Sequence, residues 1–268
     1  MTLVAGLASV VLSDAETCDP APYLREKKAK KSLGLQDALA VVAAGRALEA
    51  AGLARSLPGE RTGLFLAVGY IPALERDFLP VLEGSLDADG RFSLGRFAAE
   101  GYLRAHPLLA FRCLPNMPAY HVASSFGIEG PYSVLYPGAG ELYLALEQAV
   151  AALERGDVDV ALVVGVAHQR NFLVEHHMRR LLPPVDQAQL RDAAAFVLER
   201  AAGSRGHAAR ARLESVEVGY EPFDCLATVP AARASVIRDG GERVSVPGEL
   251  GPASPLVAVQ VALEAGAT

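Results

Sequence analysis

The sequence has no tryptophan and few aromatic residues, 6% in all. Its three cysteines, Cys18, Cys113 and Cys225, are far apart and form no CxxC pair, which argues against a disulfide framework or a zinc site. A reducing cytoplasm fits this cysteine usage. GxGxxG and Walker patterns are absent, so no nucleotide cofactor is implied. We therefore expect a cytoplasmic protein without a metal or a cofactor.

Runs of charge are almost missing. The net charge is −6, and one basic run, residues 25–31, is the exception, so the sequence has no electrostatic footprint for nucleic acid. This run is typical of a solvated loop or a first helical turn, and the alternative is a docking patch for an acidic partner. The apolar residues 2–12 have no basic leader and are too few to span a membrane, so they predict a first strand.

What the sequence has is a hydrophobic fraction of 51%, rich in alanine and valine, which suits helices packed on a buried sheet. Periodicity predicts a short buried strand at 132–136, a helix at 141–154 and a strand at 158–164, the span of a parallel crossover. The sheet must then be covered on both faces. Further strands are expected at 62–68, 194–199, 213–220 and 243–246, and helices at 35–53 and 254–264.

Two local arrangements complete this prediction. The strands at 194–199 and 213–220 are expected to pair as a hairpin around residues 203–206. Residues 71–112 mix proline, glycine, acidic residues and phenylalanine without a steady period. They predict an irregular excursion with short helices that covers a site or an interface.

Three segments carry a family resemblance: Asn116-Met117-Pro118-Ala119, the Phe-Gly-Ile-Glu-Gly-Pro of residues 126–131, and the Arg-Gly-Asp-Val-Asp-Val of residues 155–160. With residues 46–53 and 60–63, they resemble the N-terminal half of β-ketoacyl synthases. The resemblance implies an α/β fold of the thiolase type, with layers α/β/α/β/α. It also implies a single domain over 1–268, with an N-terminal half at 1–170 and an abbreviated C-terminal half at 171–268.

The catalytic residues of that family are replaced. The family places a cysteine at the start of the helix after the Gly-Pro strand, and the matching residue here is Ala139, between Gly138 and Gly140. Glu249 stands where a histidine is expected, without a preceding lysine, and the other histidine segment is absent. A methyl group cannot accept an acyl chain from a thioester. The resemblance therefore implies a chain without catalysis of its own.

Within the family, such a chain is similar to chain-length-factor subunits of type II polyketide, aryl-polyene or fatty-acid-like synthases. The implied partners are a catalytic ketosynthase subunit and an acyl carrier protein, with a homo- or heterodimer formed across the strand at 132–136. No nucleic acid, membrane or metal is implied. The candidate tunnel or interface residues are Asn116, Met117, Tyr120, His121, Phe126, Tyr136, Ala139 and Glu141.

Two alternatives stay open. One is a repurposed thioester hydrolase or acyltransferase that works through His121, Glu141 or a histidine of residues 169–180, such as His176 or His177. The other is a homodimeric scaffold that docks a carrier protein on the basic run. Cys113, between Phe111 and Leu114, is expected to be a structural thiol rather than a substitute nucleophile.

Overall fold

The chain is described by a computed structural model over residues 2–10, 18–54, 56–70, 74–136, 141–168, 171–180, 192–200, 211–213, 235–237 and 243–245, with Val216, Ala253, Leu256 and Gln260. These residues form a six-stranded mixed sheet in the order β3-β2-β4-β5-β1-β6. The strands are β1 (Thr2–Val10), β2 (Thr62–Val68), β3 (Tyr132–Leu135), β4 (Val160–Val166), β5 (Ala193–Arg200) and β6 (Ala211–Leu213).

The two halves of the sheet differ in direction. Strands β3 and β4 both pair with β2 in parallel, which confirms the predicted crossover through the helix between them. Strands β4, β5, β1 and β6 then run antiparallel to one another. The mixed sheet with helices on it confirms the α/β class.

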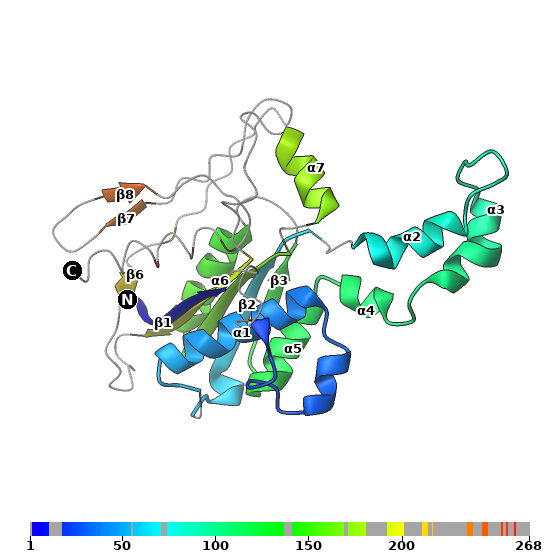
Figure 1. Cartoon of the computed structure of the whole chain (residues 1–268). Helices are drawn as coiled ribbons and strands as arrows, with labels where there is room; N and C mark the ends of the chain where they lie inside the picture. The colour runs from blue at the N-terminus through cyan, green and yellow to red at the C-terminus, as the bar shows by residue number, and fades with distance from the viewer. Residues whose placement is uncertain are drawn as a thin grey trace.

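Helices cover both faces of this sheet (Figure 1). On one face lie α1 (Leu35–Ala50) and α5 (Met117–Phe126), and on the other lies α6 (Glu141–Arg155). Side chains alternate along β2, so that Leu64 and Leu66 contact the first pair while Phe65 contacts α6. Helix α1 is buried around most of its circumference because it packs between the sheet and α5.

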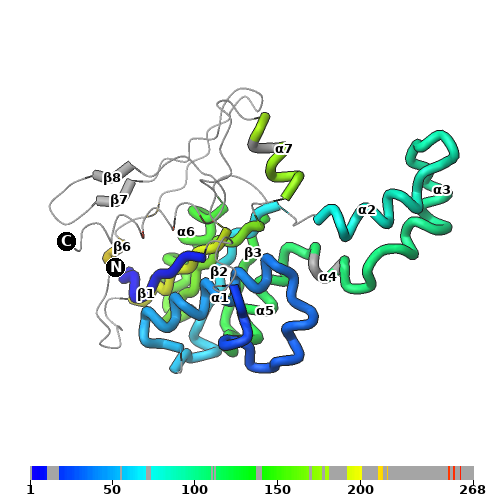
Figure 2. Tube along the Cα trace, in the orientation of Figure 1, coloured from blue at the N-terminus to red at the C-terminus, as the bar shows by residue number. Residues whose placement is uncertain are grey.

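Residues 75–113 form an arm that extends away from the sheet (Figure 2). Three aromatic rings of the arm lie side by side, because Phe97 lies 6.0 Å from Phe92 and 6.3 Å from Tyr102 between ring centroids. The arm confirms the expected excursion with short helices. Its elements are α2 (Glu75–Glu83), α3 (Leu94–Arg96), η4 (Phe97–Gly101), η5 (Tyr102–Arg104) and α4 (Leu109–Cys113).

Two expectations need correction, and one strand was not expected. Strands β5 and β6 do not form a hairpin, because β1 lies between them and pairs with both. Strand β3 is not buried, because it is the edge of the sheet and Tyr132 is 71% exposed. Strand β7 (Ser235–Ile237), which is not among the expected strands, pairs with β8 (Arg243–Ser245).

Two other predictions are tested only in part. Most of the strand expected at 213–220 and of the helix expected at 254–264 lies outside the described residues. Helix α7 (Phe172–Arg180) follows β4 and covers most of residues 169–180, which contain the candidate histidines His176 and His177.

Candidate functional site

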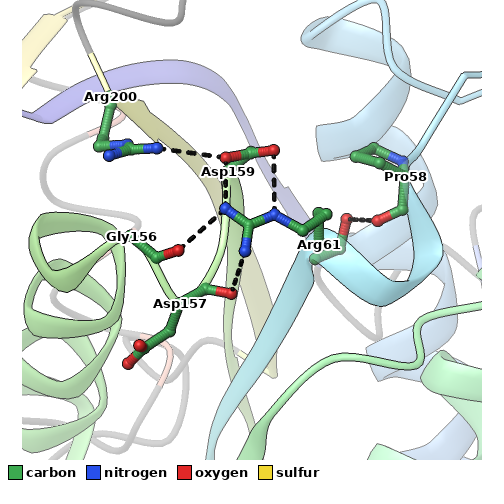
Figure 3. Close-up of polar contacts among 7 residues, drawn as sticks. Pro58, Arg61, Gly156, Asp157, Asp159 and Arg200 are labelled. Carbon is green, nitrogen blue, oxygen red and sulfur yellow. Dashed lines mark hydrogen bonds and ion pairs between the residues drawn. The ribbon is translucent and has the colours of Figure 1, made fainter.

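Two of the family-like segments meet at one end of the parallel strands (Figure 3). The guanidinium of Arg61 donates to both carboxylate oxygens of Asp159, at 2.9 and 3.2 Å. It also donates to the carbonyls of Gly156 and Asp157, and Arg200 of β5 donates to the same Asp159 at 3.3 Å. These residues therefore fix the strand ends and belong to the scaffold rather than to a substrate site.

The Gly-Pro of the second segment is required by a close backbone approach. A Cβ atom at Gly130 would lie 2.3 Å from the carbonyl oxygen of Thr62. The next carbonyl, that of Pro131, accepts a hydrogen bond from the amide of Leu64 at 3.0 Å. Only glycine lets the chain enter β3 this close to β2.

Helix α5 carries five of the predicted site residues. Asn116 is its exposed N-terminal flanking residue, Met117 and Phe126 are half-buried, Tyr120 is exposed and His121 is buried. The Phe126 ring lies 6.2 Å from that of Tyr23. These side chains differ in exposure and surroundings. They are close in the sequence, but they do not line one common cleft.

The other predicted residues lie around the turn before α6. Tyr136 is 37% exposed, and Glu141 is half-buried at the first position of α6, where burial raises the pKa of its carboxyl group. Ala139 and Glu249 lie outside the described residues. Helix α6 packs on the sheet face opposite to α5, so Glu141 and His121 belong to elements on opposite faces of the sheet.

The remaining candidates from the sequence are dispersed. His176 is exposed on α7, the His177 side chain lies outside the described residues, and Cys113 is half-buried at the end of α4. Within the described ranges, no three side chains of the histidine, cysteine, aspartate or glutamate type gather as metal ligands. Across those ranges, too, no helix combines the length and the apolar character that crossing a bilayer requires.

Sequence reasoning missed a buried ionisable pair. The Nε2 atom of His121 lies 3.8 Å from Oδ2 of Asp37 in α1, and both side chains are 3% exposed. Burial raises the pKa of Asp37 to about 7, although the amide of Gly34 donates to its carboxylate at 2.7 Å. Burial also lowers the pKa of His121. The available signal was an aspartate near the start of a helix that is mostly apolar.

The fold and these segments define a layered α/β protein of the ketosynthase type. The family model described as beta-ketoacyl synthase, N-terminal domain, matches residues 4–202. The chain therefore belongs to the β-ketoacyl synthase family. The spectinabilin polyketide synthase system protein NorC of Streptomyces orinoci is 28% identical over 176 residues, which are 65% of this chain and 7% of NorC.

Solved structures show the same fold. A type II polyketide synthase ketosynthase in complex with its acyl carrier protein (AntDE:AntF) matches with a TM-score of 0.56 and 16% identity, over 78% of this chain and 65% of that chain. The ishigamide ketosynthase/chain length factor matches with a TM-score of 0.55 and 18% identity, over 78% and 61%. A β-ketoacyl synthase of Burkholderia phymatum matches with 0.53 and 16%, over 78% and 62%. This chain thus spans less than two thirds of the relatives it matches.

Proposed function

We propose that this chain is a non-catalytic, chain-length-factor-like subunit that pairs with an active β-ketoacyl synthase and helps to shape the tunnel for the growing acyl chain. The pathway would be a type II polyketide, aryl-polyene or fatty-acid-like synthesis. The observation that carries the proposal is a ketosynthase scaffold whose sequence has Ala139 at the turn between β3 and α6. In this proposal residues 1–268 act as one domain.

The chemistry of this turn supports the absence of catalysis. A helix N-terminus stabilises a thiolate, but Ala139 has no ionisable group and cannot form a thioester. Glu141, two positions later in the sequence, is half-buried and carries a carboxyl group whose pKa is raised by burial. A carboxylate so near would oppose a thiolate even if a cysteine were restored.

The exposed edge of the sheet supports pairing with another chain. Among the described residues, β3 pairs with β2 alone and is the edge of the sheet, and such edges invite a further strand. Beside it lies a mainly apolar hollow of about 520 Å³ between β3 and α6, lined among others by Phe65, Tyr132, Gln148 and Ala152. An edge strand with an adjoining apolar hollow suits a partner of the same fold.

The arm adds a second apolar surface. Leu94 is 72% exposed, Leu103 75%, Tyr102 64% and Phe92 56%. A group of apolar side chains that are each more than half exposed is typical of an interaction surface. One structural relative is a ketosynthase/chain length factor and another is a ketosynthase in complex with its acyl carrier protein, which supports these two kinds of partner.

The experiment is co-expression with the ketosynthase encoded nearest to this chain, followed by size-exclusion chromatography with light scattering. We expect a complex that condenses acyl and malonyl carrier-protein thioesters, and no condensation by this chain alone. The matched control is a complex of two variants, in which this chain carries Ala139→Cys and the partner carries alanine in place of its nucleophile. This pair should stay inactive, because the rest of the catalytic set is missing.

Two outcomes would overturn the proposal. One is condensation by the purified chain alone, and the other is co-expression that gives neither a complex nor a change in product. The alternative of a new hydrolase built on His121 and Glu141 has no geometric support, since these residues belong to helices on opposite faces of the sheet.

A further inference from the structure

A polar cavity of about 260 Å³ lies between residues 24–32 and helix α5. Its basic side chains are Arg25 and Lys28, and Ser124 and Ser125 of α5 line it with Tyr120 and His121. The cavity does not belong to the turn before α6, because α5 and α6 cover opposite faces of the sheet.

The inner wall of this cavity contains a buried group without a hydrogen bond. His121 is 3% exposed, and its Nε2 atom has no hydrogen-bond partner among the described residues. The carboxylate of Asp37, 3.8 Å away, is beyond hydrogen-bond distance. A buried ring nitrogen left in this state costs free energy, so a ligand that bonds to it or charges it gains affinity.

The charged side chains at the opening of the cavity determine whether it favours an anionic or a cationic ligand. The guanidinium of Arg25 lies against Gly127, where a Cβ atom would be 2.2 Å from its Nη2 atom. Lys28 lies beside Glu26, which also lines the cavity, at 3.1 Å. Two cations against one carboxylate leave an excess of positive charge, and a guanidinium with serine hydroxyls matches the tetrahedral oxygens of phosphate.

We propose that this cavity binds the phosphate group of a small phosphate monoester, with Arg25, Lys28 and the serine hydroxyls as its partners and His121 as the buried group behind them. The volume admits a phosphate group with a short organic tail. The surrounding charged and titratable groups are Asp37 on α1, Tyr120 on α5, and Arg25, Glu26 and Lys28 on the segment opposite.

Binding should be coupled to a proton. An anion close to the imidazole favours the imidazolium form of His121, which burial otherwise disfavours. The imidazolium would then face Asp37 at ion-pair distance and stabilise its carboxylate. The affinity for the anion should consequently rise as the pH falls through the range in which histidine titrates.

The test is calorimetric titration of the full chain with glycerol 3-phosphate, and with glycerol as the control that lacks phosphate. We expect binding only of the phosphate. Lys28→Ala should weaken it about tenfold, the usual effect of losing one charge-assisted hydrogen bond. The matched control, Lys30→Ala, should leave it unchanged, because Lys30 pairs with Asp19 and does not line the cavity.

The proton coupling is tested with sulfate, whose charge is constant near neutral pH. Sulfate should bind several-fold more tightly at about pH 6 than at about pH 8, and His121→Asn should reduce the difference to the part that comes from ionisation of Asp37. If that variant does not fold, the His121 ring signals of the wild type provide the same test, since sulfate should raise its pKa. Equal binding of glycerol, equal effects of the two lysine variants, or a pH-independent sulfate affinity would each overturn the proposal.

Discussion

Arg61 holds Asp159 by both carboxylate oxygens, and the two residues lie 98 positions apart in the chain. Arg61 directly precedes β2, and Asp159 directly precedes β4. The pair therefore fixes the register of two parallel strands. The hydrogen bond from Arg61 holds the pKa of Asp159 below its ordinary value. The motif residues of the family thus act here as a structural clamp.

The first prediction concerns this clamp. Arg61→Ala should lower the free energy of unfolding, because it removes a bidentate pair and two hydrogen bonds to carbonyls that join the ends of two strands, although solvent partly screens them. The contribution of Asp159 is present above its ordinary pKa and is lost as the pH falls through the lower pKa of the folded chain. Urea unfolding of the wild type and of Arg61→Ala at neutral and acid pH measures both the loss of stability and its pH dependence.

The control for the clamp is Arg155→Ala. Arg155 also pairs with a carboxylate, that of Asp157 at 2.8 Å, but its side chain is 63% exposed and the pair joins residues two positions apart. We expect a loss below about 0.5 kcal/mol. If the two variants lose equal stability, the cross-strand geometry adds nothing.

The sequence predicted those elements whose signal is local. The strand at 62–68 and the helix of residues 35–50 follow from hydrophobic periodicity, and the motif segments follow from residue type and spacing. The placement of β1 between β5 and β6 could not be predicted, because nothing local in a strand specifies which of two later strands pairs with each side.

The site was predictable to a smaller extent. The resemblance marked α5 and the turn before α6, but it gave no sign that Asp37 and His121, 84 positions apart, lie 3.8 Å from each other. The depth of burial of a polar residue depends on elements that pack on it from elsewhere in the chain. Its pKa, and any chemistry that depends on it, therefore appear only in the fold.

The second prediction concerns Asp37. The pKa of this group is about 7 in the folded chain and 3.8 ordinarily, so its contribution to stability is present below about pH 4 and is lost as the pH rises to about 7. Asp37→Asn cannot ionise and can still accept from the Gly34 amide. At about pH 8 it should be more stable than the wild type by roughly 2–4 kcal/mol.

Urea unfolding of Asp37→Asn and the wild type at about pH 4 and pH 8 checks this sign. The control is Asp19→Asn, because Asp19 is exposed and its pKa is lowered by the hydrogen bond from Lys30. The free energy of unfolding of Asp19→Asn should change with pH as that of the wild type does between these two pH values. If the free energy of unfolding of the wild type and of Asp37→Asn changed equally between these two pH values, the raised pKa of Asp37 would be contradicted.

The third prediction concerns the arm. Leu94→Asp with Leu103→Asp should leave the stability of the isolated chain within about 0.5 kcal/mol, because both side chains are more than 70% exposed. The same change should weaken the complex with the ketosynthase more than about tenfold if the arm is part of the interface. The control, Leu173→Asp on α7, alters a residue that is 45% exposed and lies outside the arm. An unchanged complex in the double variant would remove the arm from the interface.

The fourth prediction concerns carrier docking. The four lysines of the chain all lie within η2 (Lys27–Lys31), an exposed element with no buried residue, so we expect an acidic carrier protein to dock there. Carbodiimide, which joins amines to carboxylates, should cross-link the carrier to this segment. Lys27→Glu with Lys31→Glu should weaken docking about tenfold and reduce its salt dependence. Lys27→Arg with Lys31→Arg keeps the charge and should keep the affinity, while it lowers the cross-linking yield. Equal affinity of the glutamate and arginine variants would place the carrier on another surface.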